Sequence, residues 1–135
     1  MKTTFADSFY YFAIVNPDDA AHELAHEFAH AYTGRVVTTA WVVTELADGL
    51  AKPAAARSQF RGILRDLQAD PATRVLGPSD ELMSAGLDLY LRRKDKHWSL
   101  TDCISFVVMK RERITDALTG DHHFEQAGFR ALLKP

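Results

Sequence analysis

Four acidic residues, far apart in the sequence, are the strongest candidates for chemistry. Asp7 interrupts an apolar run, Glu45 lies in a helical segment, Asp102 follows "WSLT" and Asp121 follows "ALTG". A carboxylate is rarely buried unless it is paired, hydrogen-bonded or bound to a metal. Two carboxylates about 4 Å apart repel each other by roughly 4 kcal/mol at an effective dielectric of about 20, so a cluster needs protons or a cation. Mg²⁺ and Mn²⁺ prefer carboxylate and water oxygens.

Each acid also has a purely structural interpretation. In "SLTD", Asp102 has the spacing of a capping box with Ser99. Asp121 fits the N-cap of a short helix that begins with "HHFEQ". Glu45 lies off the apolar face of its helix, as a solvated glutamate does, and Asp7 fits a surface turn. Whether these residues form a site or have only structural roles depends on where they lie relative to the strands and helices.

Strand-like and helix-like segments alternate along the chain. The expected strands are residues 3–6, 36–40, 73–77, 114–119 and 129–133. The expected helices begin at Pro17, after Ala40, at about Ala54, after Ser79, at Ser99 and within residues 120–128. This alternation predicts one α/β domain with a largely parallel sheet and helices on both faces.

The expected topology places all four acids at one edge of the sheet. Open α/β sheets bind ligands beyond the carboxyl ends of their strands. Asp7 follows the first strand, Glu45 lies in the first turns of the helix after the second, and Asp121 follows the fourth. The helix that contains Asp102 leads back into the fourth strand, so its N-terminus lies at the same edge. That helix continues "CISFVVM", which is apolar nearly all round and therefore predicts burial.

The composition is that of a soluble globular domain. Of the 135 residues, 47% are hydrophobic and 25% are charged, and the net charge is −2. No overall positive field indicates a nucleic-acid binder, although a local basic patch would suffice. The single cysteine, Cys103, excludes an intrachain disulfide and predicts a cytoplasmic location. The N-terminus lacks the pattern of a signal peptide, and no apolar run is long enough to predict a membrane span.

Four stretches resemble the PIN-domain ribonucleases, and among them the VapC-like toxins of bacterial toxin–antitoxin pairs. They are "FADSF", "TTAWVVTELADGL", "WSLTDCISFVVM" and "ALTGDHHFEQAGF", which contain the four acids in order. The resemblance covers nearly the whole chain, and its most specific part is the pair Asp102 and Asp121, nineteen residues apart. It implies a three-layer α/β/α fold with a central, mainly parallel sheet of about five strands, as one domain over residues 1–135.

The resemblance also implies a reaction. The four acids of a PIN-domain ribonuclease hold Mg²⁺ or Mn²⁺, and metal-activated water hydrolyses an RNA phosphodiester bond. Asp7 and Asp102 are then the main ligands, Glu45 binds a second ion or orients the water, and Asp121 acts directly or through water. The residues agree with this chemistry, because a bound metal ion can lower the pKa of water from about 15.7 to about 7 and the sequence offers no good protein nucleophile.

Further site residues and partners follow from the same resemblance. Ser8 and Thr119 match polar neighbours of the acids in the family and are lesser candidates. Asp116 is another lesser candidate, because its offset from Asp102 fits the motif less well. The implied partners are an RNA substrate, an antitoxin protein and a second copy of the chain.

Basic and aromatic residues are candidates for binding RNA or a partner. The candidates for contact with RNA phosphates are Arg92, Arg93, Lys94 and Lys96, with Lys110, Arg111 and Arg113 beyond them. An ordinary solvated surface explains these residues equally well. Phe9, Tyr10, Tyr11 and Phe12 fit base stacking, a partner groove or the core.

Several other interpretations stay open at the level of sequence. "DHH" at residues 121–123 also occurs in another class of phosphoesterases, which need further motifs and a longer chain. Cys103 with His97 would suit a thiol dyad, although a lone cysteine in an apolar helix is usually inert packing. His22, His26 and His30 recur at helical spacing and fit a soft-metal site or a solvated flank. The main rival is a catalytically silent PIN-like module that acts in dimerisation and partner binding.

Overall fold

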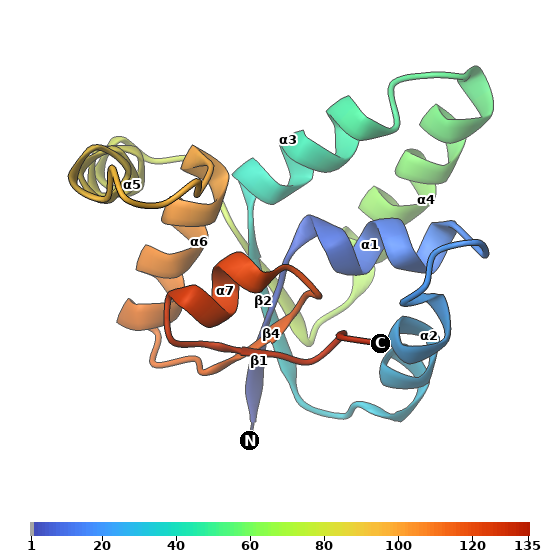
Figure 1. The fold of residues 1–135 in the computed structure, drawn as a ribbon. Helices are drawn as coiled ribbons and strands as arrows, with labels where there is room; N and C mark the ends of the chain where they lie inside the picture. Colours follow the sequence, from blue (N-terminus) through green and yellow to red (C-terminus); the bar gives the residue numbers. More distant parts are fainter. Residues whose placement is uncertain (1) are drawn as a thin grey trace.

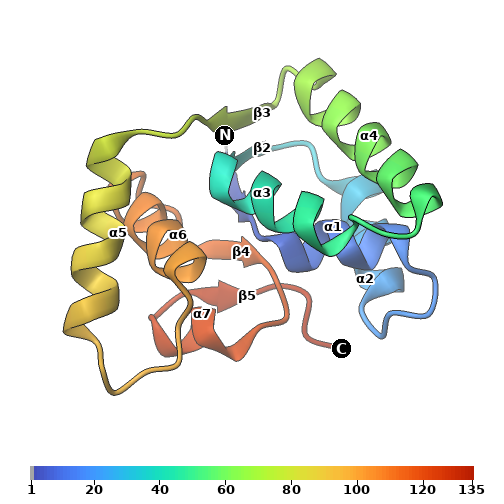
Figure 2. The same ribbon diagram turned by 90° about the horizontal axis from the view of Figure 1, so that it is seen from above.

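A five-stranded parallel sheet forms the centre of the molecule (Figures 1 and 2). The structure is a computed structural model, and it describes residues 2–135. The strands are β1 (Thr3–Ala6), β2 (Arg35–Thr39), β3 (Thr73–Leu76), β4 (Asp116–Leu118) and β5 (Arg130–Ala131). Their order across the sheet is β3-β2-β1-β4-β5, and every neighbouring pair is parallel. This confirms the predicted sheet.

Helices cover both faces of the sheet. They are α1 (Ser8–Val15), α2 (His22–Ala31), α3 (Ala40–Gly49), α4 (Ala54–Ala69), α5 (Asp80–Arg92), α6 (Leu100–Arg111) and α7 (His122–Gln126). Figures 1 and 2 show α5 and α6 on one side of the sheet, and α1, α2 and α4 on the other. α3 packs against α1, α4 and α6, so it spans the two outer layers at the carboxyl edge of the sheet. The three-layer α/β/α fold is therefore confirmed.

α6 is the buried helix that the sequence predicts. Its central residues, from Cys103 to Phe106, are almost fully buried, as are Val108 and Met109. Its N-terminus carries a complete capping box between Ser99 and Asp102. Because the rest of the helix is embedded in the core, this polar first turn has a fixed position at the edge of the sheet.

The sequence analysis does not predict α1. Almost every residue from Ser8 to Val15 is apolar or aromatic, and α1 packs on more than one side, with Ser8, Tyr10, Tyr11 and Ala13 buried. A helix that is apolar all round lacks the one-sided pattern from which a helix is recognised.

Within residues 2–135 no helix has the length and apolar character needed to cross a membrane.

The predicted start of the following helix at Pro17 is wrong. Asn16 ends α1, and its side-chain oxygen accepts a hydrogen bond from the Asp18 backbone N–H at 3.1 Å. The Asp19 carboxylate accepts one from the Ala21 N–H at 2.8 Å. These side-chain bonds form a turn from the same residue types that also favour helix starts, and α2 begins only at His22.

Candidate active site

The four predicted acids line one cleft at the carboxyl edge of the sheet. The cleft has a volume of about 370 Å³ and is lined by residues from the junction between β1 and α1, from α1, α3, α6 and α7, and from the loops before α6 and α7. Besides Asp7, Glu45, Asp102 and Asp121, its lining includes Ser8, Phe9, Phe12, His97, Ser99 and His123. The structure therefore brings together acidic side chains that are up to 114 residues apart in the sequence.

Asp7 is the most deeply buried of the four acids. It lies between β1 and α1, and only 5% of its surface is exposed. The Thr119 hydroxyl donates a hydrogen bond to its Oδ2 at 2.8 Å. Burial raises the pKa of Asp7 to about 7, and repulsion from Asp102 and Glu45 adds to the shift, while the Thr119 bond opposes it. Without a cation, this carboxyl group therefore holds its proton far above its ordinary range.

Two of the lesser candidates position the acids. Thr119 is fully buried after β4, and its hydroxyl oxygen also accepts a hydrogen bond from the Asp121 backbone N–H at 3.1 Å. It therefore joins the Asp7 carboxylate to the start of the Asp121 turn. Ser8 donates a hydrogen bond from its hydroxyl to Glu45 Oε1, which links the start of α1 to α3.

Glu45 reaches the cleft from the second turn of α3. The Thr39 hydroxyl caps this helix by accepting a hydrogen bond from the Val42 N–H at 3.2 Å, so the helix starts directly where β2 ends. Burial raises the pKa of Glu45, the Ser8 bond lowers it in part, and repulsion from Asp102 and Asp121 raises it further. Glu45 therefore lies within electrostatic range of the other cleft acids.

Asp102 forms the predicted capping box with Ser99 and also lines the cleft. Its backbone N–H donates to the Ser99 hydroxyl at 3.0 Å, and its Oδ2 accepts from the Ser99 backbone N–H at 3.2 Å. Only 8% of Asp102 is exposed, and burial raises its pKa despite these hydrogen bonds. The capping box therefore holds the Asp102 carboxylate at the cleft, so the structural interpretation of this residue is compatible with a role in the site.

His123 is a site residue that the sequence analysis missed. Asp121 caps α7 by accepting a hydrogen bond from the His123 backbone N–H at 2.9 Å. The His123 ring nitrogen Nδ1 lies 3.1 Å from Asp102 Oδ2 and 3.5 Å from Asp121 Oδ1. The available signal was the "DHH" segment, in which the N-cap turn directs the third residue back toward the capping acid.

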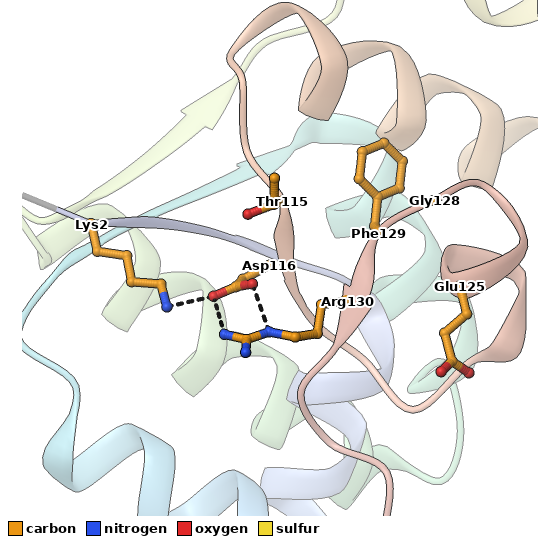
Figure 3. Close-up of a pocket in the computed structure, with 7 residues that line it drawn as sticks. All are labelled: Lys2, Thr115, Asp116, Glu125, Gly128, Phe129 and Arg130. Carbon is orange, nitrogen blue, oxygen red and sulfur yellow. Dashed lines mark hydrogen bonds and ion pairs between the residues drawn. The ribbon is translucent and has the colours of Figure 1, made fainter.

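Asp116 lies outside the cleft, which corrects its status as a lesser candidate. It begins β4, at the end of the strand opposite Thr119. The Arg130 guanidinium donates two hydrogen bonds to it, both at 2.9 Å, and Lys2 also pairs with it (Figure 3). These contacts lower the pKa of Asp116, with the Arg130 hydrogen bonds as the largest cause. Asp116 therefore joins β4 to β5 in a separate pocket.

The predicted phosphate-binding residues lie at the end of α5 and in the loop before α6. Arg92 pairs with Asp88 at 3.6 Å, and Arg93 pairs with Asp95 at 2.9 Å. The Arg93 guanidinium also lies 4.9 Å from the centre of the Trp98 ring. Part of the positive charge in this segment is therefore matched by neighbouring acids.

The aromatic residues of α1 divide between two surfaces. Phe9 and Phe12 line the acidic cleft, whereas Tyr10 and Tyr11 line a separate pocket of about 510 Å³. Both tyrosines are buried, and burial raises the pKa of Tyr10 to about 12. Only Phe9 and Phe12 are therefore placed to contact a ligand of the cleft.

Two alternative sites lose support from the structure. Cys103 is fully buried and burial raises the pKa of its thiol to about 11, which disfavours a reactive thiolate. His22 and His26 have ring centres 4.8 Å apart along α2. Within residues 2–135, however, the one set of three or more His, Cys, Asp or Glu donor atoms within 4.8 Å of one another is Asp121, His122 and His123.

The donor set of the cleft fits a hard divalent cation. Its lining holds four carboxylates and no Lys or Arg. In the part of the chain that the structure describes, the only ion pairs of these four acids are those of Asp121 with His122 and His123 and that of Asp102 with His123. Burial is the largest cause of the raised pKa of Asp7, Glu45 and Asp102, and repulsion from the other acids adds to each shift. A divalent cation with oxygen ligands is the group that these residues fit.

The structure is thus a three-layer α/β/α sandwich with an acidic cleft at the carboxyl edge of its parallel sheet. No family model and no curated protein sequence matches this chain. Among solved structures, it is similar to VapC20 of Mycobacterium tuberculosis, described as a Sarcin-Ricin loop cleaving toxin. The TM-score is 0.83 at 23% identity, over 93% of this chain and 95% of that one.

Two further structures share the fold. FitAcB from Neisseria gonorrhoeae matches with a TM-score of 0.68 at 17% identity, over 95% of both chains. VapBC2 from Rickettsia felis, solved bound to a DNA fragment from their promoter, matches with a TM-score of 0.65 at 14% identity, over 96% of both chains. These likenesses confirm the resemblance to VapC-like PIN domains at the level of the fold.

Proposed function

We propose that this protein is a divalent-metal-dependent endoribonuclease and the toxin of a toxin–antitoxin pair. The observation that carries the proposal is the convergence of four carboxylates, from four separate segments, on one cleft without a neutralising Lys or Arg. The likeness to VapC20, described as a Sarcin-Ricin loop cleaving toxin, supports the choice of RNA as substrate. The fold alone does not define an activity, so the acidic cleft has the greater weight.

Asp7 and Asp102 are the proposed main ligands of Mg²⁺ or Mn²⁺, and Glu45 and Asp121 complete the set. When bound, the cation supplies charge neutralisation for the phosphate and a water molecule with a lowered pKa. Glu45, which Ser8 holds at the cleft, is placed to orient this water or to bind a second ion. Because Asp7 has a pKa of about 7 without a cation, we expect cation binding to release a proton from the cleft.

The remaining lining residues suit a nucleic acid. Phe9 and Phe12 offer aromatic surface to a base beside the acids. Arg92, Arg93, Lys94 and Lys96 stay candidates for contact with the phosphate backbone. A nucleic acid would otherwise be repelled by the four acids, so cation binding and RNA binding should be coupled.

The first experiment measures RNA cleavage together with metal binding. Purified protein should cleave a structured RNA in Mg²⁺ or Mn²⁺ and stop in EDTA. Asp7→Asn and Asp102→Asn should each reduce the rate by at least about 100-fold, since even outer-shell changes at metal sites cost about 10- to 100-fold. In Asp102→Asn, the asparagine keeps a side-chain oxygen that can accept the hydrogen bond from the Ser99 backbone N–H, so the capping box of α6 should persist.

Thermal unfolding with and without Mn²⁺ separates the proposed enzyme from a catalytically silent module. A ligand at about 100 times its Kd stabilises the folded state by about 2.7 kcal/mol, so Mn²⁺ should raise the Tm of the wild type and not that of Asp7→Asn. Cleavage that continues unchanged in EDTA would contradict the metal mechanism. Absence of both cleavage and metal stabilisation would favour the silent module.

The proposed partners are an antitoxin protein and a second copy of the chain. VapBC2, which shares the fold, is described as bound to a DNA fragment from their promoter. Co-expression with the product of a neighbouring reading frame should yield a stable complex in which RNA cleavage is inhibited. Cleavage that is unaffected by every such co-expressed product would count against the toxin role.

A further inference from the structure

The imidazole of His123 lies between two carboxylates of the acidic cleft. Its Nδ1 is 3.1 Å from Asp102 Oδ2 and 3.5 Å from Asp121 Oδ1, and 20% of its side chain is exposed. The ring stands at the start of α7, where the N-cap bond from the His123 N–H to Asp121 holds the backbone. His123 is therefore a positioned part of the cleft wall.

The spacing of these donor atoms is that of neighbouring ligands on one ion. Ligands about 2.1 Å from an octahedral cation lie about 3.0 Å from their nearest neighbours. The separation from Asp102 is close to this value and that from Asp121 is somewhat longer. His123 also belongs, with Asp121 and His122, to a group of side chains whose donor atoms lie within 4.8 Å of one another. A neutral imidazole is a good metal ligand, so the geometry suits coordination as well as a hydrogen bond.

We propose that His123 is a nitrogen ligand of the divalent cation in this cleft, and that it shifts the preference of the site from Mg²⁺ toward Mn²⁺. This inference rests on the proposed function, because it assigns a further ligand to the same site. Mg²⁺ binds almost entirely through oxygen, whereas Mn²⁺, as a first-row transition metal, accepts a nitrogen ligand more readily. A site with carboxylates and one imidazole should therefore favour Mn²⁺ more strongly than a site with carboxylates alone.

Two of the other five histidines provide the controls. His122 lies 3.5 Å from Asp121, but 67% of its side chain is exposed and it does not line the cleft. His97 also lines the cleft, and it lies in the exposed loop before α6. If either residue were the nitrogen ligand, its substitution would have the effect that we assign to His123.

The decisive measurement is pulsed electron paramagnetic resonance of Mn²⁺ bound below one equivalent. Electron spin echo modulation from ¹⁴N should be present in the wild type, absent in His123→Gln, and retained in His122→Gln and His97→Gln. Titration of free Mn²⁺ should show an affinity loss of about tenfold or more in His123→Gln, with a smaller loss for competing Mg²⁺. His123→Asp offers an oxygen ligand instead, and it should bind the ion without ¹⁴N modulation and with a relative preference for Mg²⁺.

The outcomes separate this inference from the proposed function. Wild-type protein that binds Mn²⁺ and cleaves RNA without ¹⁴N modulation would overturn the role of His123 and leave the function standing. Modulation that persists in His123→Gln and His123→Asp, or that disappears in His122→Gln or His97→Gln, would overturn it as well. A wild type that binds no Mn²⁺ would overturn both. Thermal unfolding without metal establishes that each variant is folded.

Discussion

Asp7 shows how a single residue couples the site to the stability of the fold. The protein buries this carboxyl group among other acids and provides one side-chain hydrogen bond, from Thr119. Without a cation, burial destabilises the charged form of this carboxyl group in the folded state, which raises the pKa of Asp7 to about 7. The same property that favours cation binding should therefore destabilise the metal-free protein at neutral and alkaline pH.

We predict that the metal-free protein loses stability as the pH rises from about 4 to about 7. The pKa of Asp7 is about 7 in the folded state against an ordinary value of 3.8, so between these pH values the folded state holds a proton that the unfolded state has lost. The free energy of unfolding then falls with pH, by about 4 kcal/mol at most from this residue. Glu45 and Asp102 shift in the same direction.

Urea unfolding in EDTA at pH 5 and pH 8 measures this effect. Asp7→Asn should reduce the difference between the two pH values, and it should be at least as stable as the wild type at pH 8. Mn²⁺ at pH 8 should restore the wild type and not the variant. An equal pH dependence in both proteins would show that Asp7 has an ordinary pKa in the folded state.

At the scale of elements, β4 carries polar residues with different roles at its two ends. Asp116, at the start of the strand, pairs with Arg130 of β5 and with Lys2. Thr119, just after the end of the strand, contacts Asp7 and the Asp121 turn. The short strand β4 therefore has the ion pair that joins it to β5 at one end and the acidic cleft at the other.

We expect Asp116→Asn to lower stability without changing RNA cleavage. Lys2 and Arg130 are more than half exposed, so the loss should be small, a fall of a few degrees in Tm. The pKa of Asp116 is lowered, so its stabilisation is present above its ordinary pKa near 4 and is lost as the pH falls below that value. Thermal unfolding at pH 7 and a cleavage assay test this expectation, and a large loss of cleavage would return Asp116 to the site.

Thr119→Val should impair both stability and cleavage. Valine has nearly the same shape but no hydroxyl, so Asp7 loses a donor and the Asp121 N–H loses its acceptor. Leaving buried polar groups unpaired costs about 1–3 kcal/mol. Thr119→Ser keeps the hydroxyl and is the matched control, which should retain most of the activity. Full stability and cleavage in Thr119→Val, with a loss in Thr119→Ser, would assign the role of Thr119 to its methyl group.

At the scale of the whole molecule, α5 presents apolar side chains to solvent. Met83, Leu87, Tyr90 and Leu91 are between 36% and 64% exposed and recur at helical spacing. A row of this kind favours contact with another chain, and a two-fold symmetric contact is the commonest arrangement between identical subunits. This surface supports the proposed homodimer.

We therefore predict a dimer in size-exclusion chromatography with light scattering, and a shift toward monomer in Leu91→Lys. A lysine at this exposed position should cost the folded monomer little, so its thermal unfolding should stay close to that of the wild type. A wild type that remains monomeric at high protein concentration would contradict the prediction. A dimer that is unaffected by Leu91→Lys would place the interface elsewhere.

The sequence by itself determined the sheet and the place of the four acids. Strands that alternate with helices leave few topologies, and the carboxyl ends of parallel strands meet at one edge, so Asp7 and Asp121 could be placed there from their positions alone. Glu45 and Asp102 followed from the helices that leave or enter that edge. Local signals were sufficient here because each acid stands at the boundary of a strand or in the first turns of a helix.

Only the tertiary structure decided the features that depend on packing between distant segments. α1 is apolar on all sides because it is enclosed by other elements, and its periodicity therefore carries no signal. The roles of Asp116 and His123 depend on which side chains lie opposite them, Arg130 in one case and Asp102 in the other. These contacts depend on how β5 and α7 pack against the rest of the fold. A local sequence pattern does not show which distant side chains will lie opposite each other.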